Sequence, residues 1–119
     1  EDDEVLALMD VFPQSRGHTL VISKTSKARN LLEVEPEVLS RLALTTQKVA
    51  QAVRTALNPD GLTVMQFNGA AGGQTVYHLH VHVIPRWDGE PMKGHGQAGM
   101  ADAAELKALA ERIAAAYPG

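Results

Sequence analysis

Three histidines at alternate positions are the residues of this sequence best suited to chemistry. His78, His80 and His82 lie within five positions and are separated by Leu79 and Val81. Alternate side chains of a β-strand share one face, so the three imidazoles are predicted to form a row, with neighbouring Cβ atoms about 7 Å apart. An imidazole near neutral pH can act as a nucleophile, an acid–base group or a metal ligand.

The spacing bears on the choice between a metal ion and a nucleophile. In a regular strand the Cβ atoms of the outer pair, His78 and His82, lie about 13 Å apart, so the three imidazoles cannot easily bind one ion together. Two of them, such as His78 and His80, would form a metal site with a ligand from elsewhere in the chain. A nucleophile flanked by two supporting imidazoles would use all three. The residues alone leave both interpretations open.

A glycine-rich segment comes directly before the histidines. Residues 69–75 read GAAGGQT and are predicted to form a loop whose unhindered N–H groups can approach phosphate oxygens. Thr75 adds a hydroxyl group, and the Gln74 amide can donate to an oxyanion. Such loops are common on their own, but this one leads into the histidine strand and therefore indicates a phosphorylated substrate.

Three other residues carry little meaning in isolation. His18 lies in an apolar segment, where a structural histidine is the ordinary interpretation, and Asp10 alone would be a solvated loop carboxylate. His95 lies in a glycine-rich stretch, residues 88–99, and is interpreted as an exposed loop residue without a catalytic role. Any function of His18 and Asp10 must follow from the pattern as a whole.

The elements that position these residues follow from the apolar periodicity. An amphipathic helix is predicted from Pro36 to residue 57, and a second over about 103–116 with Asp102 as its N-cap. The segments rich in β-formers predict strands at 5–9, 18–23, 62–67 and 75–84. Pro85 is predicted to end the last strand, since it has no N–H to donate. The predicted fold is α+β, with a small antiparallel sheet and two helices in a single domain spanning residues 1–119.

The composition excludes several classes of function. A length of 119 residues with 45% hydrophobic residues is typical of one soluble domain, and a net charge of −3 argues against a nucleic-acid binder. The sequence has no cysteine, so neither a disulfide nor a thiolate zinc site is expected. No apolar run approaches the roughly 20 residues of a membrane span, and residues 1–4 are acidic, unlike the start of a signal peptide. A cytoplasmic protein is therefore expected, with no membrane or nucleic-acid partner.

The combined pattern resembles the histidine triad (HIT) family, whose signature is His-φ-His-φ-His-φ-φ with φ apolar. Residues 78–84, HLHVHVI, match this signature. The resemblance extends to residues 10–13, DVFP, residues 17–22, GHTLVI, and residues 72–76, GGQTV. It is strongest for small bacterial members related to nucleoside phosphoramidases and dinucleoside polyphosphate hydrolases. It implies a HIT-like fold of about five strands, the first of them preceding the four predicted above. It also implies a homodimer, in which two sheets join edge to edge or through the long helix.

The resemblance also implies an activity, a nucleotidyl hydrolase that needs neither a metal nor a cofactor. His80 would attack the α-phosphorus of an AMP-containing substrate: an adenosine phosphoramidate, an acyl-adenylate or a dinucleoside polyphosphate. Water would then hydrolyse the covalent nucleotidyl-histidine. His82 would contact the phosphate or the leaving group, His78 would support the nucleophile, and His18 would complete the catalytic set.

Nucleotide contacts are implied for six further residues. They are Asp10 for the ribose hydroxyls, Val11 for the base, Asn68 beside the glycine loop, Gly73 and Thr75 for the phosphate, and Gln74 for the leaving-group side. Two alternatives remain: a regulatory module that binds a purine nucleotide with little turnover, and a metal protein that uses the histidines as ligands.

Overall fold

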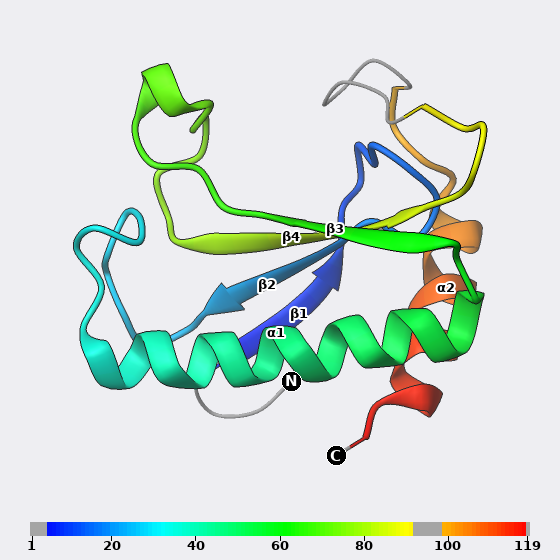
Figure 1. Ribbon diagram of the computed structural model, residues 1–119, viewed down its shortest axis with the longest axis horizontal. Helices are drawn as coiled ribbons and strands as arrows, with labels where there is room; N and C mark the ends of the chain where they lie inside the picture. The colour runs from blue at the N-terminus through cyan, green and yellow to red at the C-terminus, as the bar shows by residue number, and fades with distance from the viewer. Residues whose placement is uncertain (1–4, 92–98, 119) are drawn as a thin grey trace.

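One antiparallel sheet forms the centre of the molecule (Figure 1). The structure is a computed structural model that describes residues 5–91 and 99–118. The strands lie in the order β1-β2-β4-β3. They are β1 (Val5–Met9), β2 (Thr19–Ser23), β3 (Gly61–Met65) and β4 (His80–Arg86). The predicted α+β class is confirmed, with four strands among the described residues.

Both helices pack on one face of this sheet (Figure 1). The long helix α1 (Pro36–Leu57) crosses the strands, and α2 (Ala103–Ala116) packs against α1 and β1. The apolar core lies between the helices and the odd-numbered residues of the central strands. Its buried members include Val21, Leu42, Val49, Val53, Val83, Leu109 and Ile113. Because side chains alternate along a strand, the even-numbered residues of β2 and β4 face the other side.

The helix predictions are confirmed, and the local chemistry explains the helix ends. Pro36 occupies the first turn of α1, where its missing N–H is not needed. Asn58 ends α1 in the left-handed conformation, with φ 47°, and its N–H donates to the Arg54 carbonyl. Asp102 caps α2, since its side chain accepts a hydrogen bond from the Glu105 N–H at 3.0 Å.

The prediction for the histidine strand is wrong at both ends. β4 begins at His80 rather than at residue 75, because the preceding backbone bonds to another loop: the Leu79 N–H donates to the Ala28 carbonyl at 3.1 Å. β4 also continues through Pro85, which pairs with Leu62 of β3. Pairing with β2 ends at Val83, so the proline lies where only β3 flanks the strand.

None of the helices in the described part of the chain is long and apolar enough to cross a membrane. The strand that the resemblance implies before β1 is not among the described residues, and β1 forms an edge of the sheet.

Candidate active site

His80 has a defined proton position. Its Nδ1 lies 2.7 Å from the main-chain oxygen of His78. A carbonyl oxygen can only accept, so Nδ1 must carry the proton. A neutral imidazole has one ring proton, and Nε2 of His80 therefore keeps its lone pair. The half-buried ring thus offers one nucleophilic nitrogen at the start of β4.

His78 lies outside the strand, so the predicted row of three imidazoles on one strand face is wrong. Its Nε2 lies 2.7 Å from the main-chain oxygen of Ser23, at the end of β2, and its side chain is otherwise exposed. The contact that orients His80 comes from the His78 carbonyl rather than from its ring.

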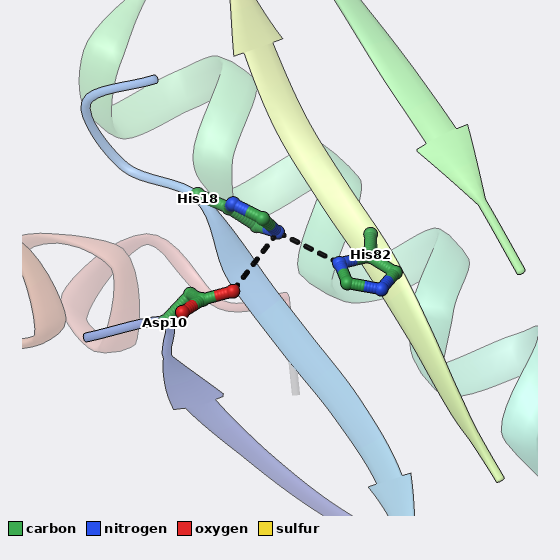
Figure 2. A group of neighbouring side chains, drawn as sticks. All are labelled: Asp10, His18 and His82. Atoms are coloured by element: carbon green, nitrogen blue, oxygen red, sulfur yellow. Dashed lines mark hydrogen bonds and ion pairs between the residues drawn. The ribbon is translucent and has the colours of Figure 1, made fainter. Parts of the chain in front are cut away.

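The structure brings together His82, His18 and Asp10, which come from three different segments (Figure 2). Nε2 of His18 lies 2.9 Å from Nδ1 of His82 and 3.5 Å from Oδ2 of Asp10. The exposed fractions are 0% for His18, 6% for His82 and 5% for Asp10. The ring of His80 lies next to this cluster, with its centroid 4.9 Å from that of His82.

The cluster has the composition of a metal site, but its hydrogen bonds disfavour one. Its ligand atoms lie within 4.8 Å of one another. The Gln14 N–H donates to Nδ1 of His18 at 3.0 Å. The only proton of neutral His18 must then lie on Nε2, the nitrogen that would have to bind the ion. The donor set therefore fits a hydrogen-bonded cluster better than a metal centre, and the predicted pair His78 and His80 is bonded to main-chain oxygens instead.

An apolar surface adjoins the imidazoles on the sheet face opposite the helices. Leu20 of β2 lies between Leu8 of β1 and His82 of β4 in the strand register. Ile22 of β2 pairs with His80 of β4. Leu8 is 37% exposed and Leu20 and Ile22 are half-buried. These side chains form a platform beside His80 that an aromatic base could stack on. Val11 is exposed at one end of it, and its carbonyl accepts from the Ala101 N–H at 2.9 Å.

The glycine-rich loop contains a one-turn 3-10 helix, Ala70–Gly72, and lies close to Phe67. Gly73 has a φ of 99°, and a Cβ there would lie 3.3 Å from Cδ1 of Phe67. The ring of Phe67 in turn packs 5.4 Å from that of His82, centroid to centroid. Thr75 is exposed beside the turn. Phe67 is a contact that sequence reasoning missed, because an aromatic residue at the end of a strand carries no specific signal.

Gln74 does not present a free amide to the site, and the prediction that it donates to an oxyanion does not fit this conformation. It is 5% exposed, and its two donors and two acceptor positions are all occupied. Nε2 donates to the carbonyls of Arg29 and Val76, at 2.7 and 3.1 Å. Oε1 accepts from the Gly69 N–H at 2.8 Å and from Asn30 Nδ2 at 3.2 Å. Gln74 therefore cross-links the glycine loop to residues 29–30.

Asn68 also bonds within the protein. Its Oδ1 accepts from the Leu31 N–H at 3.0 Å, and its amide pairs with that of Gln66 through bonds of 2.9 and 2.8 Å. The side-chain amides of Gln74 and Asn68 thus connect the loop at residues 29–31 to the glycine turn. Sequence reasoning missed this support, since a polar loop with no apolar period gave no indication of its partner. His95 lies outside the described residues.

Comparisons with known proteins agree with this geometry. Residues 1–89 match the family model described as HIT domain. The chain belongs to the HIT family. A Hit-like protein from Bartonella henselae superposes with a TM-score of 0.91 at 47% identity, over 98% of this chain and 82% of that one. A hypothetical histidine triad nucleotide-binding protein from Sulfolobus tokodaii gives a TM-score of 0.88 at 34% identity, over 98% and 79% of the two chains.

A relative with a named activity is the adenylylsulfatase HINT3 of Arabidopsis thaliana. It is 31% identical over 124 residues, which cover 99% of this chain and 62% of the relative. This chain spans 64%, 59% and 62% of the lengths of three curated relatives, the Arabidopsis protein included.

Proposed function

We propose that this HIT protein is a nucleotidyl hydrolase that cleaves at the α-phosphorus of an AMP-containing substrate through a covalent nucleotidyl-His80. The observation that carries the proposal is the 2.7 Å bond from Nδ1 of His80 to the His78 carbonyl, which leaves Nε2 as a nucleophile. Covalent catalysis divides one difficult displacement into two easier steps. The buried cluster of His18, His82 and Asp10 lies directly beside this nucleophile.

In the first step Nε2 of His80 forms a bond to phosphorus, and the bond from phosphorus to the leaving group breaks with its electron pair. Negative charge on the phosphoryl oxygens would be met by His82 and the Thr75 hydroxyl. The main-chain N–H groups of Gly72 and Gly73 already donate to the carbonyls of Gly69 and Ala70 within the loop. In the second step water attacks phosphorus and gives up a proton to the solvent, and the bond from phosphorus to Nε2 of His80 breaks. Its electron pair returns to that nitrogen, and AMP is released. Neither step needs a metal ion or another cofactor.

The substrate would lie across the open face of the sheet. The base would pack on the platform of Leu8, Leu20 and Ile22, with Val11 at its end. Asp10 would receive the ribose hydroxyls at the junction between this platform and the imidazoles. The leaving group would be an amine, an acyl group or a second phosphate, and the named activity of the Arabidopsis relative supports an adenylyl compound.

A panel of three substrates tests the function: an adenosine phosphoramidate, an acyl-adenylate and a diadenosine polyphosphate. We expect AMP to be released from at least one of them at a rate that excess chelator does not change. Loss of the rate in chelator would support the metal alternative. Tight binding of AMP without turnover of any of the three would indicate a regulatory nucleotide-binding module instead.

We also propose that the protein is a homodimer joined along β3. This strand is an edge of the sheet, and Val64 is 52% exposed although it lies on the face that α1 covers elsewhere. An edge strand with an exposed aliphatic residue favours pairing with another chain. The opposite edge strand, β1, is in contact with α2.

A further inference from the structure

The short segment that leads into α2 is fixed beside the loop that follows β1. The N–H of the peptide bond between Met100 and Ala101 donates to the Val11 carbonyl at 2.9 Å. A second contact is the ion pair of Arg16 with Glu105 in the first turn of α2, at 3.7 Å. This pair is exposed and contributes little on its own, so the main-chain bond is the principal contact. Figure 1 shows the two segments side by side, rising from the sheet on the side away from α1.

This contact lies at one end of the apolar platform. Val11 follows the end of β1 by two residues. Asp10 fixes the turn between them, since its N–H donates to the His18 carbonyl at 3.0 Å and its Oδ1 accepts from the Phe12 N–H at 2.8 Å. Val11 therefore leaves the edge strand in a defined position. The bond from the segment before α2 places Met100 next to it, beside the surface on which the base would lie.

Met100 presents a large apolar side chain to solvent at this point. It is 73% exposed, and its neighbour Val11 is 45% exposed. Exposed apolar side chains that adjoin one another are typical of binding sites, because a bound apolar group removes their surface from water. The methionine side chain is flexible, and its thioether packs favourably on aromatic rings. This surface therefore suits an aromatic ring.

The charged side chains next to Met100 have partners within the protein. A side-chain oxygen of Asp102 accepts from the Glu105 N–H at 3.0 Å, and the Glu105 carboxylate pairs with Arg16. A phosphate at this position would meet two acidic groups, whereas a neutral base would meet apolar side chains. The surface fits the base of a nucleotide and not its phosphate.

We propose that Met100 is a contact residue of the base subsite and packs against the nucleobase at the Val11 end of the platform. The inference rests on the proposed function, in which the base lies on this platform. It adds a residue from the C-terminal part of the chain, since the match to the HIT domain ends at residue 89. The main-chain bond to Val11 holds the Met100 backbone in place before the nucleotide binds.

Methyl NMR of the chain labelled with ¹³C at its methionine methyl groups tests this contact without turnover. Met100→Leu identifies the Met100 signal, because the variant lacks it. AMP should shift this signal and give nuclear Overhauser effects between the Met100 methyl group and the adenine ring protons. Ribose 5-phosphate, which lacks the base, should leave the signal unchanged. Bound AMP with no such effect, or an equal shift with ribose 5-phosphate, would overturn the inference.

The affinity for AMP gives a second readout. Met100→Ala removes the contact and should weaken AMP binding about threefold to tenfold, with the affinity for ribose 5-phosphate unchanged. Met100→Leu should retain most of the affinity, because leucine is apolar and of similar size. Leu32→Ala is the matched control, since Leu32 is 80% exposed in the loop before α1, and it should bind AMP as the wild type does. Calorimetric titration measures all four proteins, and equal AMP affinities for the wild type and Met100→Ala would refute the contact.

The outcomes separate the inference from the proposed function. A wild-type protein that neither binds AMP nor releases it from any of the three substrates would refute the proposed function, and the inference with it. A protein that binds and releases AMP while Met100 senses no base would refute the inference alone.

Discussion

At the residue scale, the proton of His80 determines what the site can do. The signature histidines could be recognised from the sequence, but the direction of each ring could not, because it depends on main-chain oxygens placed by the fold. His78 shows this well: its carbonyl orients His80, while its own ring bonds to Ser23. The sequence places both residues in one row, and only the structure separates their roles.

This separation predicts unequal effects for two neighbouring substitutions. His80→Ala should lower kcat at least about 10³-fold because it removes the nucleophile, with nucleotide affinity largely retained. His78→Ala should lower kcat less than about tenfold, since the main-chain carbonyl that orients His80 remains. Steady-state rates of AMP release and nucleotide titrations measure both effects. Equal losses for the two variants would mean that the His78 ring has a direct role.

Gly17, directly before His18, has a conformation that no other residue fits easily. Its φ is 90°, and a Cβ there would lie 2.4 Å from Cδ1 of Leu57 and 3.1 Å from Cγ of Pro85. Gly17→Ala should lower the free energy of unfolding by about 1 kcal/mol or more. Gly61→Ala is the control, because a Cβ at Gly61 meets nothing within 4 Å. Urea unfolding measures both changes, and a Gly17 variant as stable as the control would contradict the strain.

At the element scale, the two helices were predictable and the start of β4 was not. The period of apolar residues, the proline at the start of α1 (Pro36) and the N-cap of α2 (Asp102) are local signals, and both helices agree with them. The start of β4 depends on contacts between loops more than 40 residues apart in the chain, such as that of Gln74 with Arg29. Local patterns carry no information on such a partner, so the sequence could not predict that residues 75–79 leave the sheet.

The cross-link made by Gln74 predicts a stability effect. Gln74→Ala removes the partner of two main-chain carbonyls and one main-chain N–H, and should lower the free energy of unfolding by about 1–3 kcal/mol. Gln47→Ala is the matched control, since Gln47 is exposed on α1. Chemical unfolding of both variants measures the difference. If Gln74→Ala is as stable as the control but loses turnover, Gln74 acts on the substrate instead.

At the scale of the whole molecule, the proposed substrate site uses the sheet face opposite the helices, and the proposed dimer uses the edge strand β3. The family and the α+β class could be read from the sequence because the motifs span several segments. The homodimer is implied by the resemblance alone. The proposal that it forms along β3 rests on the strand order, which the sequence does not state.

Light scattering after size exclusion tests the dimer. We expect twice the chain mass for the wild type and a single chain mass for Val64→Lys, because a lysine on an edge strand opposes pairing. Leu44→Lys is the control: Leu44 is 60% exposed on α1 but lines a cleft with β1 and α2, away from β3. A dimer that dissociates in the Leu44 variant and persists in the Val64 variant would move the interface to the other edge.

The most direct test of the account is the covalent intermediate. The protein is mixed with an adenylyl substrate, quenched within milliseconds to seconds, and analysed by intact mass spectrometry and peptide mapping. The account predicts a mass increase of one AMP moiety, bound to His80, that disappears as AMP is released and is absent from His80→Ala. Turnover with no such adduct, or an adduct on another residue, would contradict the assignment of His80 as the nucleophile.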